Sequence, residues 1–371
     1  MLKKTIKKIY SRVFYISTFF KIKKINNKNK KCLLVSHDFS LSGAPLMLLN
    51  IYEYLRSQGF YVILVANDYG KMIKELRRRK IPHIVIYDKD EKLWKKVLSF
   101  DYECIFLNTI KTLFVLNFVD LSSKRCISWI HEGTTYIDNE KVDIDLSNVR
   151  LFFVSNWSLN CAKRILNIKN YQLLHYGIKN NSSKYIYNNK NNNFVIVGQI
   201  CARKNQNYVI NEYLKLDESF KKVHNLVIVG KLGDDLYGEE FTTLVKQNNE
   251  FVKYKGELSH DEVLNVISQS SVLICASVDD PLPVVVTEAL MMRTIVIVSN
   301  NVGHYEMIHY GKNGFTFNLN DSLSLKKAFI NSSIATKEVL EEGYKLYLQY
   351  FTLDKFYHQL EKGVFYDIIK K

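Results

Sequence analysis

The sequence lacks any apolar run long enough to cross a membrane. No stretch of the 371 residues reaches the roughly 18 uncharged apolar residues that a bilayer span needs. The apolar run at 13–20 follows Arg12, contains Ser17 and Thr18 and leads into Lys21 without a small-residue cleavage site, which makes it a poor signal peptide. We therefore expect a cytoplasmic protein.

Cysteine motifs are also missing. The six cysteines form no CxxC pair and have no histidine nearby at metal-binding spacing. We expect buried free thiols in a reducing compartment and no metal site. The cysteines are Cys32, Cys104, Cys126, Cys161, Cys201 and Cys275.

The common phosphate-binding motifs are absent as well. There is no GxGxxG and no GxxxxGK[ST], and the Walker-like spacing from Gly233 to Gly238 is followed by Glu239 instead of lysine. Asp-x-Asp strings, which hold a divalent metal in nucleotide-sugar enzymes of another fold, occur at 88–90 and 143–145. We interpret both as solvated loop acids, because such pairs arise easily by chance.

Most of the excess positive charge lies in the first 31 residues. The net charge is +15, but residues 1–31 contain eleven Lys or Arg and no acid, which leaves 41 basic and 37 acidic residues elsewhere. A net charge of +4 over that remainder argues against a nucleic-acid-binding face.

The basic segment 1–31 has apolar residues at helical spacing. They recur in steps of three and four among the lysines, which favours a basic amphipathic helix on an anionic membrane surface. The alternative is a solvated extension with chance periodicity. The apolar positions are Ile6, Ile9, Val13, Ile16 and Phe20.

Beyond residue 31, short apolar runs alternate with amphipathic stretches. This pattern predicts parallel sheets covered by helices on both faces. The Asn-rich stretch 179–193 interrupts it and is the best linker candidate. We therefore predict an α/β protein with two Rossmann-like parallel-sheet domains, 32–178 and 194–352, that face each other across a cleft, and a C-terminal helix at 353–371.

Three constellations stand at the ends of apolar runs. Gly43 and Ala44 precede a helix expected over 45–57, with Pro45 at its first position, and bare backbone N–H groups there can bind an anion; a plain helix cap explains them equally. Arg203 and Lys204 can neutralise a diphosphate or can be surface cations.

The third constellation is a stiff loop between two acids. Asp280 and Glu288 lie eight positions apart, and Pro281 and Pro283 between them are two of only four prolines in the chain. Such a loop can hold backbone amides against a ligand, and a helical carboxylate can accept hydrogen bonds from vicinal hydroxyls. The alternative is a rigid turn with capping acids.

In these motifs the sequence resembles glycosyltransferase family 4 (group 1 type), the retaining nucleotide-sugar enzymes of GT-B fold. The resemblance runs from about residue 32 to residue 317, with the motifs in the family's order. The matching segments are 40–45 (glycine loop), 129–132 (cleft-facing histidine), 154–157 and 176–178 (domain junction), 198–206 (diphosphate), Asp280 with Glu288 (E-x7-E), 303–306 and 311–314.

The resemblance implies a role for each matching residue. Glu288 would bind the donor ribose, while Arg203 and Lys204 would stabilise the departing diphosphate. His131 would lie beside the donor sugar and the acceptor. The donor sugar's hydroxyls would be held by Asp280 with the backbone of Pro281, Leu282, Pro283 and Val284, and the phosphates would meet Gly43 and Ala44.

The resemblance also implies a mechanism and a co-substrate. A UDP- or GDP-linked sugar would react without a bound metal, and retention would follow from front-side attack, with the leaving phosphate helping to take the acceptor proton. Two positions depart from the family pattern: Asp280 replaces glutamate, which shortens the reach, and Gln199 stands where many members have arginine. The second departure removes one cation from the diphosphate site, so Arg203 and Lys204 would have to neutralise more of the diphosphate charge.

We therefore expect a glycosyltransferase that builds a surface polysaccharide or glycolipid on a glycan or lipid-linked acceptor. It would work in the cytoplasm, with a peripheral position on the inner face of the plasma membrane. An epimerase of the same two-domain shape would lack the loop at 280–283. A catalytically silent binding or scaffold subunit is the other alternative, and Gln199 and Asp280 are the residues that support it.

Overall fold

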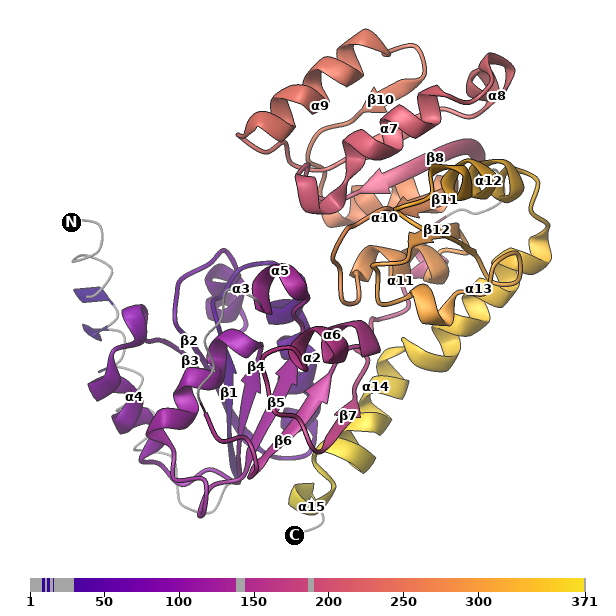
Figure 1. Cartoon of the computed structure of the whole chain (residues 1–371). Coiled ribbons are helices and arrows are strands. Elements are labelled where there is room, and N and C mark those ends of the chain that lie inside the picture. The colour runs from indigo at the N-terminus through magenta and orange to yellow at the C-terminus, as the bar shows by residue number, and fades with distance from the viewer. Residues whose placement is uncertain are drawn as a thin grey trace. The chain divides into compact units, whose positions relative to one another are not determined.

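The computed structural model describes residues 30–137, 144–185 and 190–369, together with residues 9, 10, 12, 13 and 16. The predicted helix in 1–31 therefore lies almost entirely outside the described residues, as do residues 186–189 of the predicted linker and Asp143 of the second Asp-x-Asp string. The chain divides into two compact units, Met1–Gly177 with Phe356–Lys371, and Ile178–Lys355 (Figure 1).

The first unit is built on a parallel sheet of seven strands in the order β3-β2-β1-β4-β5-β6-β7. The central strands are buried along almost their whole length, as expected for apolar runs with helices on both faces. The strands are β1 (Lys31–Ser36), β2 (Tyr61–Ala66), β3 (His83–Val85), β4 (Cys104–Asn108), β5 (Cys126–Ile130), β6 (Val149–Phe153) and β7 (Tyr171–Leu173).

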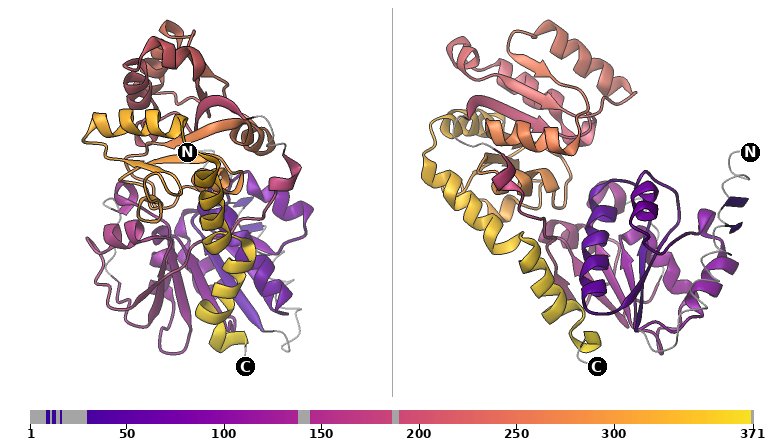
Figure 2. Two further views of the ribbon diagram at one scale, coloured as in Figure 1. Left: turned by 90° about the vertical axis from the view of Figure 1, so that its right-hand side faces the viewer. Right: turned by 180° about the vertical axis from the view of Figure 1, so that it is seen from behind.

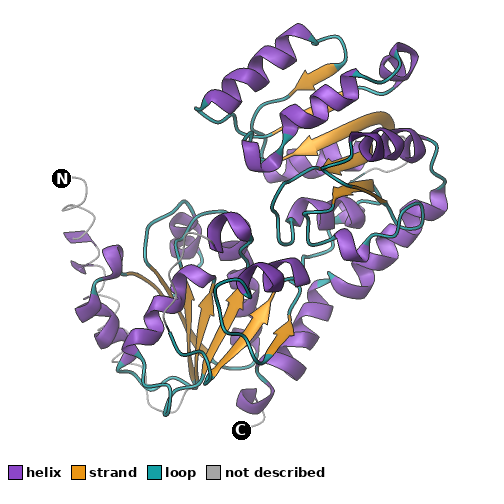
Figure 3. Ribbon diagram, viewed as in Figure 1, coloured by secondary structure: helices purple, strands orange, loops and turns teal. Residues whose placement is uncertain are grey.

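Helices of the first unit cover this sheet (Figure 3). They are α2 (Gly43–Ser57), α3 (Met72–Arg78), α4 (Glu91–Leu98), α5 (Thr134–Ile137) and α6 (Asn156–Ala162), with the 3-10 segments η1 (Tyr87–Lys89) and η2 (Ile110–Phe118). One prediction is wrong here: α2 begins at Gly43, so Pro45 is its third residue and not its first. Proline costs no hydrogen bond at this position, because it lacks an N–H group and the N–H groups of the first turn have no acceptor within the helix.

The second unit is built on a six-stranded parallel sheet in the order β10-β9-β8-β11-β12-β13. Its strands are β8 (Asn191–Val197), β9 (Leu226–Val229), β10 (Val252–Tyr254), β11 (Ser270–Cys275), β12 (Ile295–Ser299) and β13 (Phe315–Phe317). Its helices are α7 (Gln206–Leu214), α8 (Glu218–Val223), α9 (Leu236–Gln247), α10 (His260–Gln269), α11 (Val284–Met291), α12 (Ser322–Ser333) and α13 (Lys337–Tyr350), with 3-10 segments η3 (Ser182–Lys184), η4 (Ala202–Lys204) and η5 (Tyr305–Met307).

The last residues of the chain return to the first unit. After α14 (Leu353–Gln359) come a π-helical turn, η6 (Leu360–Val364), and α15 (Tyr366–Ile369). Phe356 stacks on Trp129 with ring centroids 5.5 Å apart, and Arg150 Nη1 donates to Val364 O over 3.0 Å. The yellow C-terminal segment accordingly runs beside the first sheet in both views of Figure 2.

In each sheet the order in which the chain adds strands reverses once, and the point of reversal indicates where a ligand binds. The first sheet grows from β1 to β3 and then restarts at β4 on the other side of β1, and the second sheet repeats this with β8 and β11. Open parallel sheets bind ligands outside the carboxyl ends of their strands at such switch points. The prediction of two doubly wound α/β halves is thus confirmed, and no helix of the described residues is long and apolar enough to span a bilayer.

Candidate functional site

In the second unit, the predicted diphosphate segment and the proline loop meet at the switch point between β8 and β11. The first follows β8 and the second follows β11, so neighbouring strands deliver them to the same edge. Val278 N donates to Arg203 O over 2.9 Å and fixes one segment against the other. Gln199 is exposed.

Arg203 and Lys204 converge on one carboxylate. Lys204 Nζ lies 2.5 Å from Asp280 Oδ2, and Arg203 Nη1 lies 3.2 Å from the same oxygen. Burial by itself would raise the pKa of Asp280, but the two cations outweigh burial and hold that pKa below its ordinary value. Asp280 is therefore ionised at neutral pH, and an anionic ligand can bind these cations by taking the place of its carboxylate.

Backbone hydrogen bonds hold the proline loop in place. Asp280 N donates to Asn301 O over 3.1 Å, and Gly303 N donates to Asp280 O over 2.9 Å. Pro283, with φ of −65°, caps α11, and no side chain caps that helix start. The N–H groups that begin at Val284 can therefore serve a ligand, while Leu282 is buried and anchors the loop.

Glu288 lies in the middle of α11 and is 8% exposed. Its Oε1 is 2.6 Å from Nε2 of His260, the first residue of α10. The hydrogen bond to Glu288 raises the pKa of His260. Sequence reasoning missed His260, because a histidine at a helix start carries no pattern of its own.

In the first unit, Gly43 and Ala44 are the first two residues of α2. The side chain of Ser42 makes no capping bond to this helix, and its hydroxyl lies 2.7 Å from that of Ser40. The start of α2 thus keeps backbone donors at the switch point between β1 and β4, where an anion can bind.

His131 follows β5 at the same edge of the first sheet. Its Nε2 lies 2.9 Å from Oδ1 of Asn108, the last residue of β4. Burial, together with a smaller effect of nearby His37, lowers the pKa of His131 to about 3. His131 is therefore a neutral imidazole at physiological pH.

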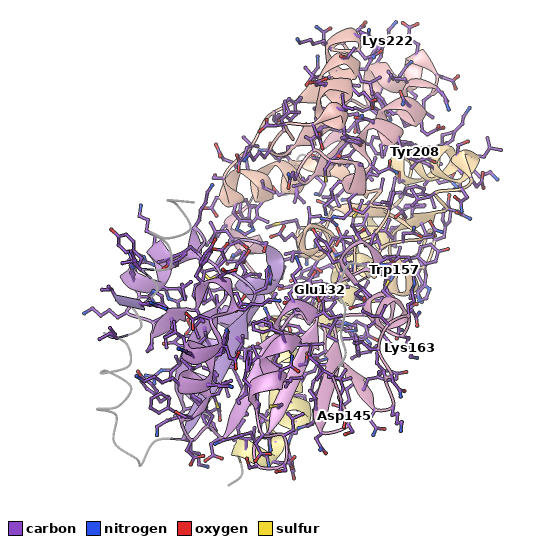
Figure 4. The ribbon with its side chains drawn as sticks, turned by 60° about the vertical axis from the view of Figure 1, so that its left-hand side comes forward. Glu132, Asp145, Trp157, Lys163, Tyr208 and Lys222 are labelled. Carbon is purple, nitrogen blue, oxygen red and sulfur yellow. The ribbon has the colours of Figure 1, made fainter. Side chains whose placement is uncertain are left out.

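Glu132, labelled in Figure 4, is a buried carboxylate beside this histidine. Its Oε2 accepts hydrogen bonds from Ile110 N and His131 N, both over 3.0 Å. Burial raises the pKa of Glu132 to about 7 even though these N–H groups act in the opposite direction. Glu132 thus fixes the backbone after β4 and after β5, and it titrates close to neutral pH.

The structure adds Asn108 and His37 to the predicted residues of the first unit. His37 follows β1, and its Nδ1 lies 3.3 Å from Oγ1 of Thr109. His37 directly follows β1 and Asn108 ends β4, and a polar residue at the carboxyl end of a buried strand is the signal that could have identified them. Of the described residues of the Asp-x-Asp strings, Asp90 caps α4 by accepting from Leu93 N over 3.2 Å, and Asp145 accepts from Ser147 N over 2.9 Å. In the part of the chain that the structure describes, no group of three His, Cys, Asp or Glu side chains could hold a metal ion.

Two family models match successive, partly overlapping parts of the chain, from residue 28 to residue 335. The model described as glycosyl-transferase family 4 covers residues 28–198, and the model described as glycosyl transferases group 1 covers residues 178–335. A capsular polysaccharide biosynthesis glycosyltransferase, CapH of Staphylococcus aureus, is 25% identical over 175 residues, which are 46% of this chain and 48% of CapH. The match therefore spans about half the length of that relative.

Solved structures share the fold at low sequence identity. The crystal structure of Anabaena HepE in complex with UDP and glucose superposes with a TM-score of 0.75 at 16% identity and covers 90% of this chain and 99% of HepE. A glycosyltransferase from Rickettsia africae superposes with a TM-score of 0.72 at 16% identity, over 93% of this chain and 99% of that one. The two α/β units are those of the GT-B fold, and the chain belongs to the group 1, family 4 glycosyltransferases.

Proposed function

We propose that the protein transfers a sugar, with retention of anomeric configuration, from a nucleoside-diphosphate sugar to a glycan or lipid-linked acceptor. The observation that carries this proposal is the convergence of Arg203 and Lys204 on Asp280, with Glu288 on the helix that follows the same loop. Cations for a diphosphate and carboxylates for hydroxyls are the groups that a nucleotide-sugar donor requires.

The donor is best tested first as a UDP-sugar. HepE, which shares the fold, was crystallised with UDP and with UDP-glucose. The similarity to CapH supports surface polysaccharide assembly as the setting. We infer a position on the cytoplasmic side of the membrane, where nucleotide sugars are available.

Donor binding would exchange the partners of two cations. In this structure, Lys204 and Arg203 neutralise Asp280. A diphosphate carries more negative charge than one carboxylate, so it draws the cations toward itself and leaves Asp280 to accept hydrogen bonds from hydroxyls of the sugar. Glu288 would accept from the ribose hydroxyls.

The chemical step would then need no dedicated base. The bond between the anomeric carbon and the diphosphate oxygen breaks, and its electron pair goes to the diphosphate, where Arg203 and Lys204 stabilise the charge. The acceptor hydroxyl bonds to the anomeric carbon on the same face, and its proton passes to the leaving phosphate. For His131 and the start of α2 we propose the roles beside the donor sugar and the phosphates that the family resemblance implies.

A screen of donors tests this function. Purified protein is combined with UDP-, GDP- and ADP-sugars in EDTA, and the thermal shift and the release of nucleoside diphosphate are measured. We expect one nucleotide series to stabilise the protein and to be turned over without metal. Stabilisation without turnover, even with candidate acceptors, would instead support the silent binding subunit.

Glu288→Ala provides the matching test of the site. Loss of the ribose contact should weaken nucleotide binding and turnover together, by about 10-fold or more for a charge-assisted bond. Glu212→Gln is the control, because Glu212 is another buried carboxylate of the second unit that pairs with Lys215. Unchanged kinetics in Glu288→Ala would remove the ribose assignment.

A further inference from the structure

A chain of hydrogen bonds joins the start of α2 to His131 through Asn108. Asn108 is fully buried at the end of β4. Its Nδ2 donates to Ala44 O over 2.9 Å, and its Oδ1 lies 2.9 Å from His131 Nε2. Ala44 belongs to α2, Asn108 ends β4 and His131 directly follows β5, so three separate elements meet at one edge of the first sheet.

The chemistry of these groups determines which atom donates and which accepts in each of the two hydrogen bonds. A backbone carbonyl can only accept, so the Asn108 group that faces Ala44 O must be the NH₂ group. The amide oxygen of Asn108 then faces His131, and that oxygen also can only accept. His131 must therefore carry a hydrogen on Nε2, and turning the amide over would bring two oxygens together at the Ala44 end.

The remaining ring nitrogen is left as an acceptor. His131 is neutral, since it is buried beside His37 and no carboxylate of the residues that the structure describes pairs with its ring. No hydrogen bond to Nδ1 occurs among the described residues, and Nδ1 is not one of their fully enclosed unpaired atoms. A neutral imidazole with hydrogen on Nε2 offers an Nδ1 lone pair to a hydroxyl donor.

The backbone around Asn108 is held in an unfavourable shape. Thr109 has φ of +102°, a value that a β-branched residue rarely adopts. Thr109 N nevertheless donates to Trp129 O over 2.8 Å, and the Glu132 carboxylate binds the next N–H group, that of Ile110. Such strain persists where surrounding contacts over-determine it, and it concentrates at functional sites.

We propose that Asn108 is a positioning residue that locks His131 in the tautomer with hydrogen on Nε2, so that Nδ1 accepts a hydrogen bond from a hydroxyl of the bound sugar. The place of the sugar rests on the function proposed above, whereas the tautomer does not. Because the same amide holds Ala44, Asn108 also ties the ring to the start of α2.

Nitrogen NMR of the histidines tests the tautomer directly. The full chain is labelled with ¹⁵N-histidine, and the resonances of His131 are assigned by their loss in His131→Gln. We expect a protonated Nε2 and an unprotonated Nδ1 in the parent protein. In Asn108→Leu, which has a similar volume but no acceptor, we expect a mixture of tautomers or protonation on Nδ1. An unchanged His131 spectrum in Asn108→Leu would overturn the proposal, whether or not the protein turns over any donor.

Two further variants separate positioning from a general loss of structure. Thr112→Val removes another buried hydrogen bond of the same segment, that from Thr112 Oγ1 to Thr109 O over 2.8 Å, and should leave the spectrum of His131 and the kinetics unchanged. Asn108→Asp keeps an acceptor for the Nε2 hydrogen and should restore the tautomer, although its second oxygen faces the Ala44 carbonyl.

Kinetics then show where the hydroxyl lies. One hydrogen bond to the reacting sugar is typically worth about tenfold in rate, and we expect Asn108→Leu to lower kcat by about that factor with a smaller change in the donor KM. Slower donor hydrolysis and slower transfer would place the hydroxyl on the donor sugar. Slower transfer alone would place it on the acceptor. A fall in kcat without a change of tautomer would make Asn108 merely structural and would refute the proposal.

Discussion

At the scale of single residues, Asp280 pairs with both Arg203 and Lys204, and under the proposed function it competes with the donor diphosphate for these two cations. Asp280→Asn keeps the shape but removes the charge. We predict that nucleoside diphosphate binds roughly fivefold more tightly, equivalent to about 1 kcal/mol, because the two cations are no longer neutralised. Transfer should fall by about 100-fold, since the sugar loses its acceptor. Calorimetric titration and turnover measure the two effects, and parallel losses would show that Asp280 holds the cations in place instead of competing for them.

Glu132 gives a second prediction at this scale. Its pKa is raised to about 7 in the folded protein by burial, so between the ordinary pKa near 4.5 and pH 7 the folded state binds more protons than the unfolded state. Its contribution to stability is thus fully present below about pH 4.5 and is lost as the pH rises through about 7. Glu132→Gln should flatten this part of the curve of unfolding free energy against pH, measured by urea titration. A slope that survives in the variant would assign the titration to another group.

At the scale of elements, β8 and β9 approach each other closely where the diphosphate segment begins. A Cβ on Gly230 would lie 1.8 Å from Gly198 O, and Gly230 has φ of +156°. Gly230→Ala should therefore force the strand ends apart and cost about 3 kcal/mol, as for overpacking in a core.

Gly256→Ala is the control for this substitution. Gly256 has φ of +73° but open space around it, so alanine there adds only backbone strain of about 1 kcal/mol. Urea midpoints measure both variants. Equal losses would mean that φ, and not the contact with Gly198, sets the cost at Gly230.

At the scale of the whole molecule, the basic segment 1–31 predicts membrane attachment. The apolar side chains described there, those of Ile9, Tyr10, Val13 and Ile16, are 57%, 66%, 63% and 53% exposed. Exposed apolar groups among lysines suit an anionic lipid surface. Deletion of residues 1–28 should abolish sedimentation with vesicles that contain phosphatidylglycerol and leave donor hydrolysis intact.

The control for this deletion keeps the apolar groups. Replacing Lys3, Lys4, Lys7 and Lys8 with glutamine should weaken vesicle binding, because each contributes about 1 kcal/mol near the surface. High salt should have the same effect in the unchanged protein. Sedimentation of the truncated protein would refute the attachment.

The sequence by itself determined the elements and their layout. Strands such as β1 and β11 are apolar runs of few residues, and burial on both faces leaves them no other arrangement than a parallel sheet under helices. The sequence also identified the proline loop at 280–283 and the pair Arg203 and Lys204. Both directly follow apolar runs, and ligands bind at the carboxyl ends of the strands that such runs form.

Only the tertiary structure decided which distant residues form hydrogen bonds and ion pairs with each other. Asn108 and His131 are 23 positions apart and His260 and Glu288 are 28 apart, and no local pattern records such pairs. The return of Phe356 to Trp129 is equally invisible in the sequence. Periodicity and turn chemistry act between near neighbours along the chain, whereas hydrogen-bond direction, tautomer and pKa depend on atoms that meet only when the sheets have formed.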